Sequence, residues 1–230
     1  MSKLLIIIRS LLFNFLFFNT TFILGIVCLP LLLSQKASVE LAALWAKLTI
    51  YYLKIICGIK ISYRGYEKLN NNTTVFALRH ESILDTILFL DYFINAKYIM
   101  KKELKYIPFY GWFAVRCGHI VVNRKGGASS LKEMLSKVED KLVANNKLII
   151  FPHGTRIKVG QSQRIQSGIY AIYKYIDTPI VPVFLSTGNE WDINGFTKRP
   201  GNIDVVFCEK IEEGLDKAQF MTQLESKINP

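Results

Sequence analysis

The feature that most restricts the fold of this 230-residue chain is an apolar run near its start. Between Ser10 and Gln35 there is no charged residue, and the run is rich in Leu, Phe and Ile. A single helix needs about 20 apolar residues to cross the hydrocarbon core of a bilayer, so this run is long enough to span a membrane. Because so much apolar surface has to leave water, the sequence predicts that residues 1–57 form a membrane-associating helical segment.

The run is not uniform, which leaves several arrangements open. A polar triplet, Asn19–Thr21, lies in its middle, and the apolar halves Leu4–Phe18 and Phe22–Leu33 are each too short to span alone. A re-entrant pair of helices that dips into one leaflet therefore competes with a full span. A signal peptide is a third reading, given Lys3 near the start. No small-residue cleavage site follows Leu33, so we do not expect cleavage.

The next stretch, Ser38–Cys57, is predicted to be a helix with a wide apolar surface. Its charged residues Glu40, Lys47 and Lys54 recur every seven positions and therefore lie on one narrow stripe. A helix with aromatic residues on its apolar surface and lysines at the edge is typical of the bilayer interface. The alternative is a helix packed on the core of a globular domain, and the two interpretations are compatible if they concern different faces.

The composition of the chain also favours association with a membrane. Lysine and arginine together exceed the acidic residues by 29 − 18 = 11, and half of all residues are hydrophobic. A basic chain binds polyanions, and the apolar bias favours an anionic membrane surface over nucleic acid. The cysteines lack the close pairing of a zinc site or a disulfide framework, which predicts free thiols facing the cytoplasm. They are Cys28, Cys57, Cys117 and Cys208. We therefore expect the chain at the cytoplasmic face of a cell membrane, without a nucleic-acid partner.

After Gly58 the sequence alternates short β-type runs with helical runs. The predicted strands are Ile59–Tyr63, Thr74–Leu78, Lys97–Met100, His119–Asn123, Lys147–Phe151, Ile180–Leu185 and Ile203–Cys208. The predicted helices between and after them are Ser82–Ile94, Ala128–Asn145, Gln163–Ile176 and Asp216–Ile228. This alternation predicts an α/β layered domain over residues 58–230, with a mixed central sheet flanked by helices. Ser130 is predicted to cap its helix, and Pro182 predicts an edge strand or a bulge.

The segment Thr74–Asp85 carries the clearest chemical signal. It reads as strand, turn and helix, and it puts His80 just past a strand end, where functional loops of α/β domains gather. His80 and Asp85 are five residues apart, or about 140° around a continuous helix. They meet only if His80 precedes the helix and Asp85 lies in its first turn, an arrangement that Ser82 as N-cap provides.

In that arrangement Asp85 accepts a hydrogen bond from one imidazole nitrogen of His80 and favours the imidazolium that forms when the other takes a proton. The pair is then a general base with its orienting carboxylate, and the nucleophile is a hydroxyl of the substrate. Two simpler readings stay open: Asp85 as part of a capping box with Ser82, and His80 as an ordinary surface residue.

Two further segments are suited to binding an anion. Phe151–Arg156 follows an apolar strand and holds a Pro-x-Gly turn, which exposes backbone N–H groups, and its Arg156 offers a fork that fits phosphate. Gly118–Arg124 ends another strand with a second arginine, ahead of two glycines. Each segment by itself also reads as a solvated arginine beside a loop glycine.

Taken in order, these segments resemble the glycerolipid acyltransferase family, specifically the 1-acylglycerol-3-phosphate O-acyltransferases. Four blocks carry the resemblance: His80-x4-Asp85, Gly118–Arg124, Phe151–Arg156 and the Val181-Pro182 strand. Lys101–Gly111 also resembles the segment that this family has between the first two blocks, and the likeness covers roughly residues 38–210. The order and spacing of all the blocks agree with the family.

The resemblance implies an acyl transfer that gives phosphatidic acid for phospholipid biosynthesis. His80 would deprotonate the free hydroxyl of lysophosphatidic acid, which attacks the thioester of acyl-CoA or of an acyl carrier protein, while Asp85 orients His80. Arg124 and Arg156 would hold the phosphate of the acceptor, with Gly154 and Thr155 shaping the turn. It implies no cofactor and no metal.

The chain departs from the family pattern at His153, where the family has Glu, and at Asn123, where Asp is commoner. An unperturbed imidazole has a pKa of about 6.5, which predicts that His153 changes charge between pH 5 and 8 beside the phosphate. Alternatively its ring points into the turn and hydrogen-bonds backbone groups. The departure leaves open a different lysolipid acceptor, or a membrane-bound pseudo-enzyme.

Overall fold

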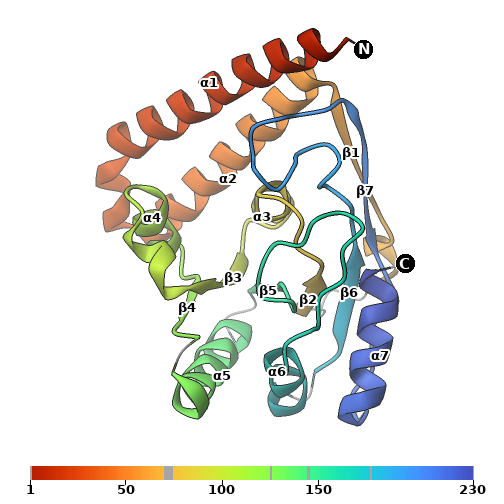
Figure 1. Cartoon of the computed structure of the whole chain (residues 1–230). Helices are drawn as coiled ribbons and strands as arrows, with labels where there is room; N and C mark the ends of the chain where they lie inside the picture. The colour runs from red at the N-terminus through yellow and green to blue at the C-terminus, as the bar shows by residue number, and fades with distance from the viewer. Residues whose placement is uncertain (1, 70–74, 125, 144–145, 177, 230) are drawn as a thin grey trace.

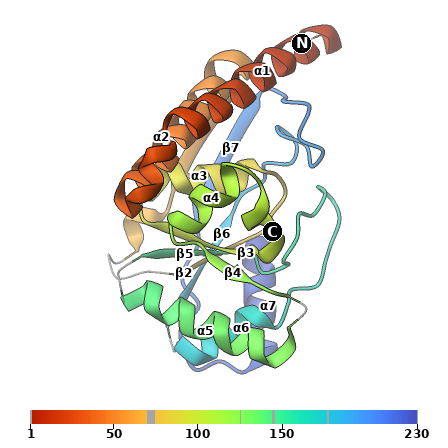
Figure 2. The same cartoon turned by 90° about the vertical axis from the view of Figure 1, so that its left-hand side faces the viewer.

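The structure is a computed structural model that describes residues 2–69, 75–124, 126–143, 146–176 and 178–229. Its strands are β1 (Ile59–Arg64), β2 (Val75–Leu78), β3 (Ala96–Lys101), β4 (Ile120–Val122), β5 (Lys147–Ile150), β6 (Ile180–Phe184) and β7 (Gly201–Phe207). Its helices are α1 (Lys3–Val27), α2 (Gln35–Tyr52), α3 (Leu84–Tyr92), α4 (Tyr110–Arg116), α5 (Gly127–Val143), α6 (Gly168–Ile176) and α7 (Lys217–Ile228). Figures 1 and 2 show the sheet between two helical layers, α1–α4 on one face and α5–α7 on the other.

The seven strands form one sheet in the order β1-β7-β6-β2-β5-β3-β4. Pairing is parallel throughout except between β6 and β7, so the predicted mixed sheet flanked by helices is confirmed. Successive side chains of a strand point to opposite faces. In β2, Phe76 and Leu78 join the core beneath α1–α3, whereas Val75 and Ala77 join the core beneath α5–α7. Both faces are covered, which explains why the central strands read as unbroken apolar runs.

α1 is one continuous helix, so of the arrangements left open for the N-terminal run, a pair of helices separated at residues 19–21 is not seen. The polar side chains are satisfied within the helix, because Asn19 and Thr21 each donate to the carbonyl four residues earlier, both at 2.7 Å. Thr21 also accepts a hydrogen bond from Trp45 Nε1 of α2 at 2.9 Å. The chain turns instead at residues 28–34, through the 3-10 helix Leu29–Leu33, and α1 and α2 lie side by side (Figure 1).

A buried lysine attaches α1 to the α/β part of the chain. Lys198 is 1% exposed, and its ammonium donates to the carbonyls of Gly195 (2.6 Å) and Phe196 (3.1 Å) and to the side chain of Asn14 in α1. Burial lowers the pKa of Lys198 to about 8. Phe13 of α1 belongs to the same hydrophobic core as β2 and β6. The two predicted domains, residues 1–57 and 58–230, therefore share one core, and the boundary between them stays a prediction.

Most predicted elements agree with the structure to within two residues, although Thr74 lies outside the described residues. The helix predicted from Ser38 begins earlier, at Gln35, and the predicted cap of α5 and the predicted start of α6 are wrong. α5 begins at Gly127, so Ser130 lies inside the helix and is not its N-cap. α6 begins at Gly168 and not at Gln163. In the preceding loop, Gln166 N–H donates to the carbonyl of Pro152 at 2.9 Å and not to a carbonyl one helical turn earlier.

Pro182 lies in an interior strand, so of the two positions predicted for it, an edge strand or a bulge, the edge strand is wrong. The carbonyl of Pro182 accepts a hydrogen bond from Cys208 N–H, so the backbone of Pro182 points toward the β7 side of the strand. On that side the pairing of β6 with β7 includes only Val183 and Phe184. Proline has no N–H with which to return that hydrogen bond, and the ladder between β6 and β7 stops at Val183.

Candidate active site

The first candidate block folds so that His80 and Asp85 meet. β2 ends at Leu78 and α3 begins at Leu84, which puts His80 in the connection and Asp85 in the first helical turn. His80 Nδ1 lies 2.8 Å from Asp85 Oδ2. Ile83, rather than Ser82, holds the N-cap position, but the Ser82 hydroxyl still accepts from Leu84 N–H at 3.1 Å. The spacing therefore predicted the contact between His80 and Asp85 correctly. It placed the N-cap of α3 one residue too early, at Ser82 instead of Ile83.

The carboxylate of Asp85 is fully buried and held from both sides. Its Oδ2 accepts from the backbone N–H groups of Glu81 (2.6 Å) and Ser82 (2.9 Å) in addition to His80. Its Oδ1 accepts from the hydroxyl of Thr187, on the loop after β6. Asp85 thus accepts backbone N–H groups at the start of α3, as a capping residue does, and also holds the ring of His80. With Nδ1 turned to Asp85, the Nε2 of His80 is the nitrogen left to exchange a proton with a substrate.

The first and third blocks lie against each other. The ring of His80 stacks on that of Phe151, with 4.1 Å between centroids, and Ile157 N–H donates to the carbonyl of His80 at 2.7 Å. The side chain of His80 keeps 17% of its surface exposed. A base that is fixed on two sides yet still open to solvent has the access that proton transfer from a bound hydroxyl requires.

A hollow of about 470 Å³, lined by both polar and apolar side chains, lies beside Phe151. It is lined by residues of the second and third blocks and by neighbouring basic and amide side chains, among them Lys101, Asn123, Arg124, Ser130, Phe151, His153, Gly154, Thr155, Gln163 and Gln166. Arg124 and Gly154 are in direct contact, because the guanidinium donates to the Gly154 carbonyl. Gly154 has a φ of 74°, and a Cβ there would lie 2.8 Å from Arg124 Nη1, so the position requires glycine.

The four predicted substrate-binding residues do not all face this hollow. Arg124, Gly154 and Thr155 line it, whereas Arg156 Nη1 donates to the carbonyl of Ile193 at 3.1 Å. Burial lowers the pKa of Arg124, an effect that the nearby charge of Glu103 opposes. A partly desolvated guanidinium gains more from an anionic ligand than a fully hydrated one does. We predicted the same phosphate-binding role for Arg124 and Arg156, but only Arg124 lines the hollow.

The predicted titration of His153 between pH 5 and 8 is wrong. His153 is 2% exposed, and burial together with the charge of Arg79 lowers its pKa to about 4. Its ring is therefore neutral over the predicted window. The alternative of hydrogen bonds to the turn is not seen either, since neither ring nitrogen has a partner among the described residues.

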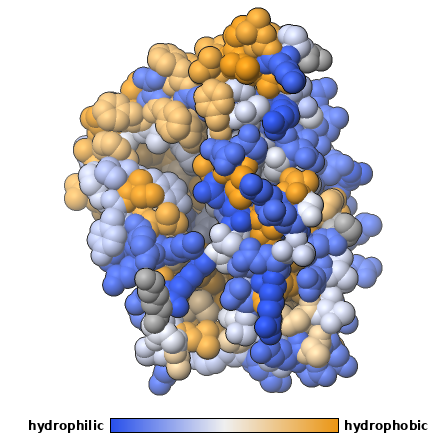
Figure 3. All heavy atoms as spheres, in the orientation of Figure 1, coloured by the Kyte–Doolittle hydropathy of each residue, from blue (hydrophilic) through white to orange (hydrophobic). Residues whose placement is uncertain are grey.

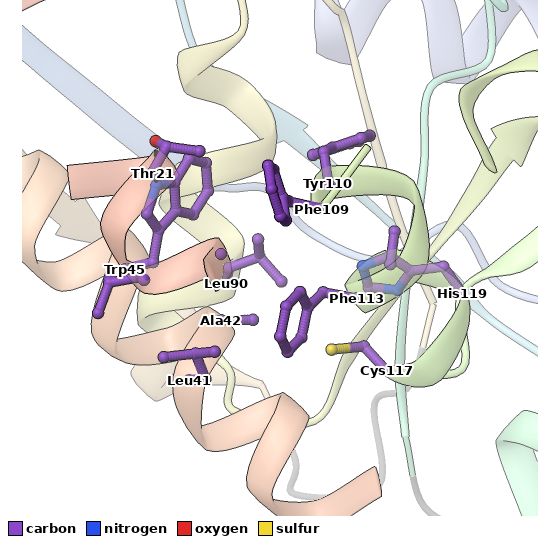
Figure 4. A pocket seen from close by; sticks show the side chains of 13 residues that line it. Thr21, Leu41, Ala42, Trp45, Leu90, Phe109, Tyr110, Phe113, Cys117 and His119 are labelled. Atoms are coloured by element: carbon purple, nitrogen blue, oxygen red, sulfur yellow. Dashed lines mark hydrogen bonds between the residues drawn. The ribbon is translucent and has the colours of Figure 1, made fainter. Parts of the chain in front are cut away.

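A second, apolar cavity of about 90 Å³ lies between the N-terminal helices and α4 (Figure 4). Its walls come from α1–α4 and the residues next to α4, including Thr21, Leu24, Gly25, Leu41, Ala42, Trp45, Leu90, Phe109, Tyr110, Phe113, Cys117 and His119. A row of ring contacts leads to it from His80. Phe151 stacks on Tyr98 at 6.0 Å, and Tyr98 meets His119 edge-on at 5.2 Å.

Sequence reasoning missed this cavity and two polar residues at the His80–Asp85 pair. Glu81 and Thr187 both contact the Asp85 region, but Thr187 is 102 residues away from Asp85 in the chain. The cavity wall likewise combines separate helices. No local spacing encodes the contacts of Thr187 or of the cavity wall, because they form only when the loop after β6 and the N-terminal helices pack against α3.

A family model described as acyltransferase matches residues 60–186, more than half of the chain. The chain belongs to the acyltransferase family. It is 30% identical over 162 residues to the 1-acyl-sn-glycerol-3-phosphate acyltransferase of Pseudomonas aeruginosa, which covers 70% of this chain and 63% of that relative. It is 28% identical to the enzyme of the same name from Cocos nucifera, covering 84% of this chain and 63% of that relative. The chain thus spans 63% of the length of each of these two relatives.

The fold of this acyltransferase-family chain is also found in a solved structure. The crystal structure of the 1-acyl-sn-glycerophosphate acyltransferase from Thermotoga maritima superposes with a TM-score of 0.77. The match covers 96% of this chain and 93% of that one at 19% sequence identity, and it supports the fold. The family resemblance inferred from the four sequence blocks is confirmed by these comparisons.

Proposed function

We propose that this chain transfers a fatty acyl group from an acyl thioester to the free hydroxyl of 1-acylglycerol-3-phosphate, giving phosphatidic acid. The observation that carries the proposal is the His80–Asp85 pair, 2.8 Å apart, next to a hollow lined by Arg124. Relatives named 1-acyl-sn-glycerol-3-phosphate acyltransferase support the choice of acceptor. The acyl donor, acyl-CoA or an acyl carrier protein, belongs to the proposal as well.

In this mechanism His80 Nε2 takes the proton of the acceptor hydroxyl as that oxygen attacks the thioester carbonyl. Asp85 holds the opposite ring nitrogen at 2.8 Å and stabilises the imidazolium while it lasts. The proton then passes to the departing thiolate. Arg124 binds the acceptor phosphate in the hollow beside Phe151.

An acyl-transfer assay with purified protein tests the function. Labelled acyl donor is supplied with lysophosphatidic acid and, in parallel, with lysolipids that carry other headgroups, and the His80→Ala variant is the background control. Formation of phosphatidic acid above that background is expected. Faster turnover of another lysolipid would replace the proposed acceptor, and no transfer to any of them would favour a pseudo-enzyme.

Arg124→Ala is expected to raise the KM for lysophosphatidic acid by about 10- to 100-fold, because a charge-assisted hydrogen bond to phosphate is lost. Arg156→Ala is the matched comparison: it removes the same side chain from a position that contacts Ile193 instead of lining the hollow. We expect a smaller rise there, and little change in the KM for the acyl donor in either variant. Initial rates measured against each substrate separately decide this. Equal effects of Arg124→Ala on both substrates would contradict phosphate binding.

We also propose that the N-terminal helices attach the chain to one leaflet at the cytoplasmic face of a membrane. α1 is long and apolar enough to span, with a mean hydropathy of 1.8. Its contacts with the rest of the chain, however, extend from Ser10, which hydrogen-bonds Lys198, to Gly25, which packs on Phe109. A helix that lies along a globular part over this length is better suited to the plane of the interface than to a crossing.

The opposite side of α1 presents a wide apolar surface. Its exposed residues are Leu4, Leu5, Ile7, Ile8, Leu11, Leu12, Phe15, Phe18, Phe22, Ile23, Ile26 and Val27. Figure 3 shows apolar side chains gathered along the top and upper left of the molecule, where Figure 1 has α1 and α4, and mostly hydrophilic side chains on the right. One apolar side facing lipid and a basic remainder facing anionic headgroups fit attachment to a single membrane face.

Membrane attachment is expected to survive washing with about 1 M NaCl, where the Debye length is only about 3 Å, because hydrophobic insertion is not screened. Replacing Leu11, Phe15 and Phe18 together by serine is expected to release the chain, since all three are more than half exposed. Sedimentation of membranes followed by detection of the chain in pellet and supernatant measures both. Release of the unmodified chain by salt would instead mean purely electrostatic binding.

A further inference from the structure

Thr187 lies on the loop after β6, and its side chain reaches into the catalytic pair from the opposite side. It is fully buried. Its hydroxyl donates to Asp85 Oδ1, the carboxylate oxygen that faces away from His80, and also lies 2.8 Å from the hydroxyl of Ser82. Each oxygen of Asp85 therefore has its own set of donors.

The direction of these hydrogen bonds follows from the chemistry of the groups. A carboxylate accepts only, so Thr187 must donate its single proton to Asp85. Ser82 is then the donor in its bond with Thr187, and it accepts in turn from Leu84 N–H at 3.1 Å. The result is a single ordered chain of donors that begins at the N-terminus of α3 and ends on Asp85.

Glu81, the residue after His80, positions the loop that carries Thr187. Its buried Oε2 accepts from Ser186 Oγ (3.2 Å) and from the backbone N–H groups of Thr187 and Gly188 (both 3.1 Å). Its Oε1 lies 3.0 Å from Arg79 Nε. Gly188 is required for this close approach, since a Cβ there would lie 3.2 Å from Glu81 Oε2 and 2.7 Å from a side-chain carbon of Val159.

We propose that Thr187 is a positioning residue for the acyl-transfer reaction: its hydroxyl holds the Asp85 carboxylate in the orientation that receives His80 Nδ1–H. This inference rests on the proposed function and extends it to a residue outside the His-x4-Asp segment. Without the hydroxyl, Asp85 Oδ1 is a buried acceptor without its donor. The carboxylate then turns or takes up a proton, and in either case it orients the imidazole less well.

Thr187→Val tests this, because valine keeps the shape of threonine and removes only the hydroxyl. We expect kcat to fall about 10- to 100-fold with little change in either KM, because an orienting hydrogen bond is lost and no substrate contact is. Thr187→Ser, which keeps the hydroxyl, is expected to retain most of the activity. Thr86→Val is the matched control: its hydroxyl donates to the carbonyl of Ile83 at 2.8 Å, one residue along α3 from Asp85 but not to it. This variant should leave kcat within about twofold of the unmodified chain.

A second readout does not depend on activity. The chain has three histidines, so ¹⁵N-labelled histidine gives few ring signals. In the unmodified chain the His80 signals should report a proton fixed on Nδ1, and in Thr187→Val they should report a mixture of both tautomers. Thermal unfolding of each variant shows that a loss of kcat occurs in folded protein.

The outcomes separate this inference from the proposed function. If Thr187→Val keeps full kcat and unchanged His80 signals, Thr187 does not position the pair. Equal loss in folded Thr187→Ser and Thr187→Val would also overturn the inference, because the hydroxyl would not be what matters. If the unmodified chain transfers no acyl group to lysophosphatidic acid, the proposed function fails, while the ring signals still decide whether Thr187 orders His80 and Asp85.

Discussion

Replacing His80 by alanine is expected to lower kcat for acyl transfer by a factor on the order of 10² to 10⁴, the contribution of general-base catalysis. The expectation rests on geometry: His80 is held by Asp85 at 2.8 Å and by the ring of Phe151 at 4.1 Å, with part of its surface still open. Alanine removes the nitrogen that receives the proton and leaves the backbone contact with Ile157 in place. Steady-state rates with lysophosphatidic acid give the effect.

His80→Gln is the matched control for this experiment. Glutamine offers an amide that can donate toward Asp85, as the imidazole does, but it has no nitrogen that takes up a proton near neutral pH. We therefore expect glutamine to preserve the melting temperature better than alanine does and to be equally inactive. Near-normal turnover of either variant, with membrane association unchanged, would contradict the role of His80 as base.

Asp85→Asn is expected to lower kcat by a factor on the order of 10³ to 10⁴, as when the orienting carboxylate of a catalytic triad is replaced by its amide. The carboxylate oxygen Oδ2 gathers His80 Nδ1 and two backbone N–H groups. An asparagine oxygen can accept from the same donors, but without the negative charge it does not stabilise the imidazolium that forms during transfer.

The geometry also predicts that Asp85→Asn folds. Its amide nitrogen would occupy the place of Oδ1 and donate to Thr187 Oγ1, whose proton then turns toward Ser82, 2.8 Å away. The bond between Thr187 and Ser82 reverses, so no donor faces a donor there, although the buried Ser82 hydroxyl gives up the acceptor that it had in Thr187. We expect a small change in melting temperature alongside the large loss of kcat. Unfolded protein, or activity close to that of the unmodified chain, would each contradict this account of Asp85.

The layered fold was predictable because hydrophobic periodicity is local. Strands such as Val75–Leu78 are unbroken apolar runs, and both of their faces are buried between the two helical layers. Predictions that depended on polar residues were less accurate. Asn19–Thr21 suggested a break in α1, but within a helix these side chains can hydrogen-bond to carbonyls one turn earlier, and two of them do.

In the candidate site, too, local features were predictable and long-range ones were not. The contact of His80 with Asp85 followed from their spacing of five residues, since a helix start between them leaves few arrangements. The separate surroundings of Arg124 and Arg156 and the lowered pKa of His153 did not follow from spacing. They depend on which loops cover each side chain and how much water those loops exclude.

The sequence by itself determined the order of strands and helices, the position of His80 at a strand end and the apolar character of the N-terminal segment. These are properties of short windows, set by side-chain periodicity and by local hydrogen bonding. Only the tertiary structure decided that α1 lies along the α/β part through Lys198, and that Thr187 completes the shell of donors around Asp85. Such contacts join residues more than 100 positions apart, and burial and hydrogen-bond direction exist only once the separate segments have packed together.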